Sequence, residues 1–241
     1  MPNVLITGGG GFIGLHLARF YSDSGFDVHL LDSLFKTGTG ADPDLEEVCG
    51  RSNVSLTVAD LTEPLDDLDL PGEFDLVYHL AAINGTELFY ERPYFVAQTN
   101  VLTTIRLMDW LEHRRVGRLV YTSTSEVYAG AETVSALEIP TDETVPVVFP
   151  QPTNVRFSYG ISKFLSEFLC NHSPSSAERE TTVIRYHNIY GPRMGLRHVI
   201  PEFLVRIANR EDPFRIFGGR ETRAFCYVDD AVAATHGVAT S

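Results

Sequence analysis

The sequence predicts an α/β fold in which helices cover both faces of a parallel sheet. Short β-branched or apolar runs alternate with longer segments of helical periodicity along most of the chain. The composition fits a folded globular protein, because 44% of the 241 residues are hydrophobic and 21% are charged. Such alternation builds right-handed strand–helix–strand units around a parallel sheet. We therefore expect a doubly wound parallel sheet.

The expected elements follow from the amino terminus onward. A strand is predicted at Asn3–Thr7, and an amphipathic helix at Phe12–Ser24, where Gly25 ends the pattern. Further strands are expected at Asp27–Asp32, Val54–Ala59, Asp75–Leu80, Leu119–Thr124 and Thr182–Tyr186. Further helices are expected at Tyr94–His113 and Tyr159–Asn171, and loops at Thr37–Pro43, Ala129–Asn154 and Gly191–His198.

Charge and hydropathy argue against several kinds of partner. The 19 basic and 32 acidic residues give a formal charge of −13, which disfavours nucleic acid and anionic membranes. No apolar run approaches the ~20 residues that span a bilayer. The amino-terminal segment lacks the basic flank and cleavage site of a signal peptide. We therefore expect a cytoplasmic protein.

One segment of this acidic chain is basic. Residues Arg185–Ala224 hold eight arginines and four acids, a local charge of about +4. This charge indicates either a solvated basic surface or a site for an anionic ligand such as a diphosphate.

The cysteines predict neither disulfides nor zinc. Cys49, Cys170 and Cys226 form no CxxC pair and are odd in number. We expect buried free thiols and no metal.

A glycine-rich run joins the first predicted strand to the first predicted helix. It is Thr7-Gly8-Gly9-Gly10-Gly11-Phe12-Ile13-Gly14. Glycines there allow a turn with positive φ, close approach of the backbone to a pyrophosphate, and close packing of helix on strand. The helix amino terminus presents free N–H groups to the phosphates. The run therefore predicts a dinucleotide site that includes Gly8, Gly11, Phe12, Ile13 and Gly14.

Asp32 ends the second predicted strand, 18 residues after Gly14. An acid at this place hydrogen-bonds the ribose hydroxyls of the adenosine, and its charge repels a 2′-phosphate. The sequence therefore favours NAD over NADP. The alternative is an aspartate that only caps the strand end.

Further motifs follow in a fixed order. They are Asp60-Leu61, His79-Leu80-Ala81-Ala82, Thr122-Ser123-Thr124-Ser125-Glu126-Val127-Tyr128, Tyr159-x-x-x-Lys163 and Arg185-Tyr186-His187-Asn188-Ile189-Tyr190-Gly191-Pro192. With these motifs the chain, from Met1 to about Ala234, resembles the extended short-chain dehydrogenases/reductases, the NAD-dependent epimerase/dehydratase family that modifies nucleotide sugars. The resemblance implies a Rossmann-type NAD-binding domain over residues 1–186. It implies a small, incomplete C-terminal substrate lobe over residues 187–241, because family members usually continue further.

The resemblance also implies binding roles. The cofactor-lining residues that it implies are Asp60, Leu61, Leu80, Ala81 and Ala82. The substrate-binding residues that it implies are Asn188, Arg193 and Arg223, and the ligand is a nucleotide-diphosphate sugar.

Tyr159 and Lys163 share one face of a predicted helix because they are four residues apart. A phenol with a pKa near 10 is a poor base, but an ammonium and an oxidised nicotinamide favour the phenolate. Lowering this pKa by about three units takes roughly 4 kcal/mol. Thr124 can orient the same substrate hydroxyl. We expect Tyr159 to remove a proton from a sugar hydroxyl while hydride passes to NAD. The alternative is a surface pair without a catalytic role.

The reaction that follows oxidation stays open. Glu126 lies two residues after Thr124, so both side chains share a face if the strand continues. The run Thr124-Ser125-Glu126 resembles UDP-glucuronate decarboxylases and GDP-mannose 4,6-dehydratases, whereas many sugar 4,6-dehydratases have Asp in the middle position. Arg220–Val228 also resembles the decarboxylases, while residues 159–163 are closer to epimerases and dehydratases. Glu126 can otherwise be a solvated carboxylate at a loop edge.

Three classes of function are therefore compared. The first is an NAD-dependent epimerase, dehydratase or decarboxylase that transiently oxidises a sugar hydroxyl, with C4 expected. The second is a catalytically silent NAD-binding sensor or scaffold, which the presence of Tyr159, Lys163 and Thr124 disfavours. The third is a reductase of a small carbonyl compound, which has no need of the arginine-rich segment.

A homodimer is also expected. The predicted helix Tyr94–His113 and the helix that carries Tyr159 lie side by side on one face of the sheet, and in the family such a pair forms a dimer interface. The apolar residues available for the interface, or for packing on the sheet, are Leu102, Ile105, Leu107, Leu165 and Phe168.

Overall fold

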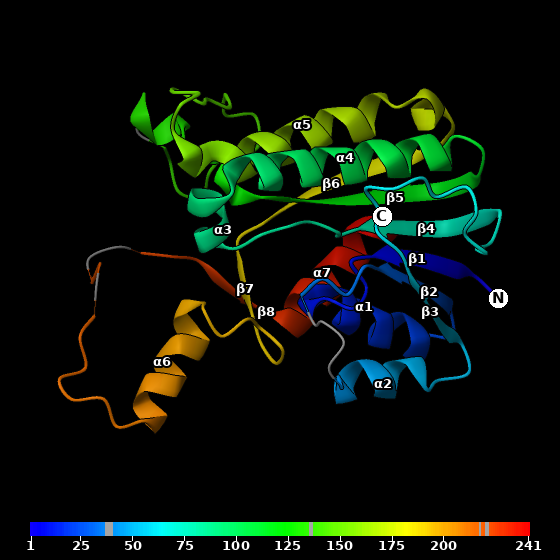
Figure 1. Ribbon diagram of the computed structural model, residues 1–241. Coiled ribbons are helices and arrows are strands. Elements are labelled where there is room, and N and C mark those ends of the chain that lie inside the picture. Colours follow the sequence, from blue (N-terminus) through cyan, green and yellow to red (C-terminus); the bar gives the residue numbers. More distant parts are fainter. Residues whose placement is uncertain (37–40, 135–136, 217, 220–221) are drawn as a thin grey trace.

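The computed structural model describes residues 1–36, 41–134, 137–216, 218–219 and 222–241. Its centre is a six-stranded parallel sheet in the order β3-β2-β1-β4-β5-β6, with helices on both faces (Figure 1). From β1 the chain runs outward to β3, then returns to the other side of β1 at β4. The predicted doubly wound α/β fold is confirmed.

Each of the six strands of the sheet overlaps a predicted strand, and two of them, β1 and β2, match the predicted bounds. They are β1 (Asn3–Thr7), β2 (Asp27–Asp32), β3 (Val54–Val58), β4 (Glu73–His79), β5 (Arg115–Thr124) and β6 (Glu180–Tyr186). Thr7 pairs with both Leu31 and His79, and Thr124 pairs with Tyr186. The carboxyl ends of the strands therefore meet at one edge of the sheet.

The helices form two layers. On one face lie α1 (Phe12–Asp23), α2 (Pro43–Cys49) and α7 (Val228–Thr240) (Figure 1). On the other face α4 (Pro93–Leu111) and α5 (Ser158–His172) lie side by side, as predicted, and α3 (Thr86–Glu91) precedes α4. The sequence patterns did not predict α2, α3 or α7. The first two are too short, at seven and six residues, to show a helical period.

Alternate residues of β1 enter the two halves of the core. Val4 and Ile6 pack in the layer that contains Leu15 of α1, whereas Leu5 packs on the opposite side with Leu107 of α4. Both faces of the sheet are therefore covered, as in other parallel sheets. Leu107 is fully buried, so it stabilises this core and is not available for a dimer interface.

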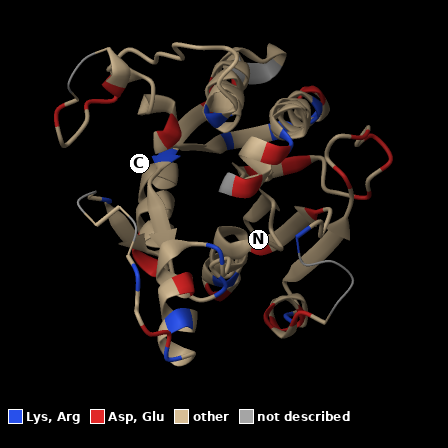
Figure 2. Cartoon of the chain, turned by 60° about the vertical axis from the view of Figure 1, so that its left-hand side comes forward, with Lys and Arg blue, Asp and Glu red and all other residues tan. Residues whose placement is uncertain are grey.

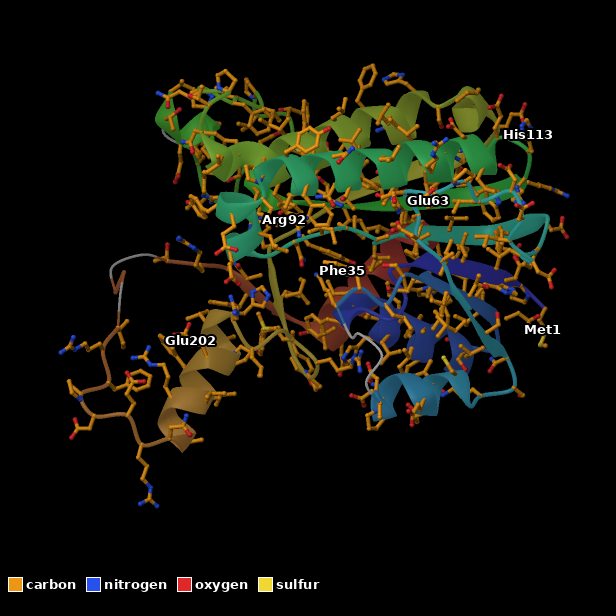
Figure 3. The ribbon with its side chains drawn as sticks, in the orientation of Figure 1. Met1, Phe35, Glu63, Arg92, His113 and Glu202 are labelled. Atoms are coloured by element: carbon orange, nitrogen blue, oxygen red, sulfur yellow. The ribbon has the colours of Figure 1, made fainter. Side chains whose placement is uncertain are left out.

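A small second unit stands beside the sheet. Strands β7 (Asn188–Tyr190) and β8 (Phe225–Tyr227) pair in parallel, and α6 (Val199–Ala208) carries no buried residue. Glu202 of α6 lies apart from the sheet (Figure 3). The expected division at residue 186 stays a prediction, since α7 belongs to this C-terminal part but packs on α1.

Much of the predicted basic charge of residues Arg185–Ala224 is paired. Figure 2 shows basic and acidic residues interleaved in the part that contains α6. The described ion pairs are Arg185–Glu167, Arg193–Asp42, Arg197–Glu87 and Arg206–Glu211. The segment is therefore less positive towards solvent than its sequence indicates. Arg220 and Glu221, part of the motif Arg220–Val228, lie outside the described residues.

Two further expectations concern the surface and the thiols. Within the described ranges, no helix combines the length and the apolar character that crossing a membrane requires. Cys170 is buried as expected, whereas Cys49 and Cys226 are only half-buried.

Candidate active site

A cleft of about 650 Å³ opens at the carboxyl ends of the parallel strands. Ligands of open α/β sheets bind at this edge, where the strand order reverses between β1 and β4. Every strand of the sheet supplies a lining residue at its end or just after it: Gly8, Asp32, Asp60, Leu80, Thr124 and Tyr186. Phe35, which follows β2, also lines it (Figure 3).

The glycine run forms the floor of the cleft. Gly8 has φ +71°, and a Cβ there would lie 2.8 Å from the Ala81 nitrogen. A Cβ on Gly14 would lie 2.3 Å from the Gly8 carbonyl oxygen, so helix α1 approaches the turn this closely only with glycine. No described side chain caps α1, and its first turn holds no acid. Its N–H groups at Phe12 and Ile13 can therefore donate hydrogen bonds to phosphate oxygens.

Asp32 is fixed at the end of β2. Its carboxylate accepts hydrogen bonds from the Gly10 N–H at 3.0 Å and from the Leu34 N–H at 2.8 Å. The negative charge is thus held in the cleft at the position that suits ribose hydroxyls and repels a 2′-phosphate.

Tyr159 and Lys163 enter the cleft from the first two turns of α5. The ring of Tyr159 stacks on Phe89 of α3, and the Lys163 ammonium lies 4.3 Å from the centre of the Tyr121 ring. Burial lowers the pKa of Lys163 to about 7. Burial, and secondly the charge of Glu126, raise the pKa of Tyr159 above its usual value. Added positive charge is therefore what the tyrosine requires in order to ionise.

Thr124 and Glu126 lie at the end of β5. The strand does not continue to Glu126: it ends at Thr124, and residues Ser125–Tyr128 form a 3-10 helix. Glu126 nevertheless lines the cleft because this turn follows its edge, whereas Ser125 does not. The Thr124 Oγ1 accepts the Glu126 N–H at 3.2 Å, which leaves the Thr124 hydroxyl hydrogen available for a ligand oxygen.

The three expected substrate residues are placed differently from one another. Asn188 lines the cleft and donates to the Ala224 carbonyl oxygen at 2.9 Å, which joins β7 to β8. Arg193 also lines the cleft, but its guanidinium forms an ion pair with Asp42 and donates to the Gly10 carbonyl oxygen at 3.0 Å. Arg223 is exposed and outside the cleft, donating to the Thr222 carbonyl oxygen. Asn188 and Arg193 thus both line the cleft, with Arg193 beside the glycine turn, and Arg223 does not line it.

A buried polar chain behind the cleft was not predicted. The Thr7 hydroxyl lies 2.8 Å from His79 Nδ1, and His79 Nε2 lies 3.1 Å from the Thr104 hydroxyl. Burial lowers the pKa of His79 to about 3, so the imidazole is neutral. On α4, Asn100 accepts from the Ile83 N–H at 2.7 Å and donates to Ser162 of α5. The sequence offered one signal for this buried polar chain: Asn100 and Thr104 are polar residues on the apolar face of the predicted helix Tyr94–His113.

Two other cleft residues also went unpredicted. Lys36 donates to the Asn84 side-chain oxygen, which joins the loop after β2 to the loop after β4. Burial lowers the pKa of Lys36, and the charge of Asp32 opposes that shift. Neither residue belongs to a periodic pattern, and the sequence offered no signal for them.

The fold and this cleft define a Rossmann-type dinucleotide-binding protein, and Thr124, Tyr159 and Lys163 line the same cleft. The uncapped α1 terminus, the fixed Asp32 carboxylate and the glycine turn all fit NAD. A model of the NAD dependent epimerase/dehydratase family matches residues 4–241, and the chain belongs to this family. Its cofactor is NAD.

Relatives with known names modify nucleotide sugars. The chain is 34% identical over 236 residues to the UDP-N-acetyl-alpha-D-glucosaminuronate decarboxylase of Bacillus cytotoxicus, covering 96% of this chain and 69% of that protein. It is 32% identical over 232 residues to UDP-glucuronic acid decarboxylase 1 of Xenopus tropicalis, covering 95% and 51%. The chain thus spans about half to seven tenths of the length of these relatives.

Solved structures show the same fold. A UDP-galactose 4-epimerase has 28% identity and a TM-score of 0.75, with 98% of this chain and 71% of that chain covered. The UDP-glucuronic acid 4-epimerase of Bacillus cereus, solved with UDP-glucuronic acid and NAD, has 25% identity and a TM-score of 0.78, with 99% and 73% covered.

Proposed function

We propose that the protein oxidises the C4 hydroxyl of a nucleotide-linked uronic acid and then removes the sugar carboxyl group as carbon dioxide. The observation that carries this proposal is the convergence of Thr124, Glu126, Tyr159 and Lys163 on one cleft, beside the residues that suit NAD. The named decarboxylases among the relatives support the choice of a uronate. Ser125 in place of an acid argues against the elimination of water.

Tyr159 is the base in this proposal. Its phenolate takes the proton of the C4 hydroxyl, while the Thr124 hydroxyl donates to the same oxygen and orients it. Bound NAD supplies the acceptor for the hydride that leaves C4. Lys163 follows Tyr159 by four residues on the same helix, and its side chain is almost fully buried. Its ammonium stabilises the phenolate.

The oxidised sugar is a β-keto acid. The bond between C5 and C6 breaks, carbon dioxide leaves, and the electron pair moves into the C4 carbonyl. The hydroxyls of Thr124 and Tyr159 stabilise the resulting oxyanion at C4 by hydrogen bonds. C5 then takes up a proton, and no acid is needed to expel a hydroxyl group. The C4 carbonyl finally takes back the hydride, and its oxygen takes the proton from Tyr159, so the net change is the loss of carbon dioxide.

A second candidate is epimerisation at C4. The structural likeness to two 4-epimerases favours it, and so does the pattern of residues 159–163. It ranks lower because Glu126 puts a carboxylate in the cleft, where simple 4-epimerases more often carry small or polar residues. A silent NAD-binding module would bind NAD and convert no sugar.

Isotopic labelling at C4 tests the proposed oxidation. We would follow the protein with NAD and UDP-glucuronate that carries deuterium at C4. The proposal expects slower turnover of the labelled sugar. Any product that is reduced again at C4 should carry the deuterium there. Normal turnover with the label lost to solvent would contradict oxidation at C4.

We also propose a homodimer through α5. Ile161, Phe164, Leu165 and Phe168 are 37–59% exposed. Phe164 and Leu165 each lie three or four residues from Ile161 and from Phe168, so the four share one face of the helix. They form an apolar stripe on the face of α5 turned away from the sheet. A second copy of this stripe would cover it in a symmetric pair.

A further inference from the structure

Glu126 is held in an ion pair at the edge of the cleft. Its Oε2 lies 2.5 Å from Nη1 of Arg156. Arg156 belongs to a short 3-10 helix, Val155–Phe157, that leads directly into α5 and ends two residues before Tyr159. The Asn154 side chain accepts the Arg156 N–H at 3.1 Å and fixes this approach. The guanidinium is thus positioned by the same segment that positions the tyrosine.

The carboxylate of Glu126 opposes ionisation of Tyr159. Both residues line the cleft, and the charge of Glu126 adds to burial in raising the pKa of the phenol. A like charge beside a developing anion disfavours that anion. A cation paired with the carboxylate reduces its repulsion of the phenolate. Arg156 is this cation, and its side chain is 38% exposed.

We propose that Arg156 is a positioning residue: by pairing with Glu126 it screens that charge from Tyr159 and lets the tyrosine serve as base near neutral pH. This inference rests on the proposed function, in which Tyr159 is the base. It assigns Arg156 no contact with substrate or cofactor, and Arg156 does not line the cleft.

Other charged and titratable groups surround Tyr159. Lys163 follows on α5 itself, Tyr121 of β5 interacts electrostatically with Tyr159, and Tyr90 of α3 interacts with Arg156. The described residues of α4 at the cleft are Thr99 and Thr103, whose hydroxyls do not titrate near neutral pH. The titratable residues on the rest of the cleft wall are Asp32, Lys36, Asp60, Tyr186, His187, Arg193 and His198. Among the described residues none of these forms an ion pair with Glu126, so removal of Arg156 takes away the cation that is paired with this carboxylate.

The test measures ionisation of Tyr159 without a substrate. Phenolate absorbance of the NAD-loaded protein is titrated against pH, and the Tyr159→Phe signal is subtracted to isolate Tyr159. Arg156→Gln should raise the midpoint by about one pH unit, as for loss of one nearby opposite charge. Arg156→Lys should restore the midpoint to within a few tenths of a unit. Glu126→Gln alone should lower it, which also tests the pair if Arg156→Gln folds poorly.

The double variant shows whether Arg156 acts through Glu126. In the Glu126→Gln background, Arg156→Gln should move the midpoint by less than half of its single effect. An unchanged midpoint in folded, NAD-binding Arg156→Gln protein, or an equal shift in both backgrounds, would overturn the inference. Failure of every nucleotide sugar to react, with the midpoint moving as expected, would instead count against the proposed function.

Discussion

The ring of Phe89 stacks on the ring of Tyr159, with centroids 5.0 Å apart and planes inclined by 12°. Phe89 is itself 8% exposed, so α3 holds the tyrosine ring in a closely packed position at the cleft. Offset aromatic stacking depends on the ring and not on the hydroxyl. Removal of the hydroxyl alone therefore separates the chemistry of Tyr159 from its packing.

Tyr159→Phe should keep this stacking and lose the base. We expect turnover to fall by about 10³-fold, within the range for loss of a general base. The affinity for NAD should change by less than about twofold. Initial rates with the active sugar and calorimetric NAD titration measure the two effects. A variant with wild-type turnover would refute the assignment of the base.

Lys163→Met should stabilise the protein without nucleotide. The folded state holds Lys163 at a pKa of about 7, whereas the usual pKa of a lysine is 10.5. Between these values the unfolded chain binds the extra proton, so wild-type stability rises with pH across this window. The free energy of unfolding of the variant therefore exceeds that of the wild type most below pH 7, by on the order of 5 kcal/mol at most. This difference disappears towards pH 10.5. Urea unfolding at several pH values measures it, and a loss of stability at pH 6 would contradict it.

Asp32→Asn should weaken discrimination between the two dinucleotides. Asparagine keeps one oxygen acceptor for the Gly10 or Leu34 N–H and loses the charge that repels a 2′-phosphate. We expect the Kd for NAD to rise about tenfold, which corresponds to about 1.4 kcal/mol, and the Kd for NADP to rise less or to fall. Fluorescence titration with both reduced dinucleotides compares them. An undiminished preference for NAD would show that Asp32 does not set it.

Arg193→Gln should loosen the cofactor site. The Arg193 and Asp42 side chains are 15% and 17% exposed, and Arg193 also holds the Gly10 carbonyl. We expect about a tenfold weaker Kd for NAD, because a partly buried pair next to the glycine turn is broken. Arg197→Gln is the matched control: Arg197 pairs with Glu87 at 79% exposure, and loss of such a surface pair should change the Kd by less than about twofold. Equal effects of the two changes would remove Arg193 from the site.

Phe168→Glu should give a monomer if the α5 stripe is the dimer interface. Phe168 is 59% exposed, so the change introduces little strain into the single chain but puts a charge into a paired apolar surface. Val238→Glu, at 41% exposure on α7, is the control and should leave the assembly unchanged. Analytical ultracentrifugation reports both masses. A wild-type monomer would contradict the proposed interface at the outset.

The sequence predicted the sheet because its strands are short apolar runs between turn residues. Asn3–Thr7 and Asp27–Asp32 match their predicted bounds. The start of β5 at Arg115 was not predicted because Arg115, Gly117 and Arg118 interrupt the apolar run ahead of Leu119. Helix α6 was missed, and unlike the three helices that were predicted it carries no buried residue.

The site was predictable where a motif fixes the backbone, as at Gly8, Asp32 and Lys163. The site was less predictable where a side chain contacts a residue that is distant in the sequence. The ion pair between Arg193 and Asp42 joins positions about 150 residues apart. The close approach of Gly8 to Ala81 also joins two segments that are distant in the sequence. Local sequence carries no record of such contacts. Ser125 does not line the cleft: β5 ends at Thr124, and Ser125 is the first residue of the 3-10 helix. The end of a strand depends on packing and is not fixed by the local sequence.

The most direct test of the proposed function is product analysis. The protein and NAD are incubated with UDP-, GDP- and dTDP-linked sugars, including UDP-glucuronate, and product masses and sugar proton spectra are recorded. We predict loss of carbon dioxide from a nucleotide-linked uronate. An isomer of unchanged mass would show epimerisation, and loss of water would show dehydration; both contradict decarboxylation. No product from any sugar, with NAD bound, would contradict the proposed enzyme itself.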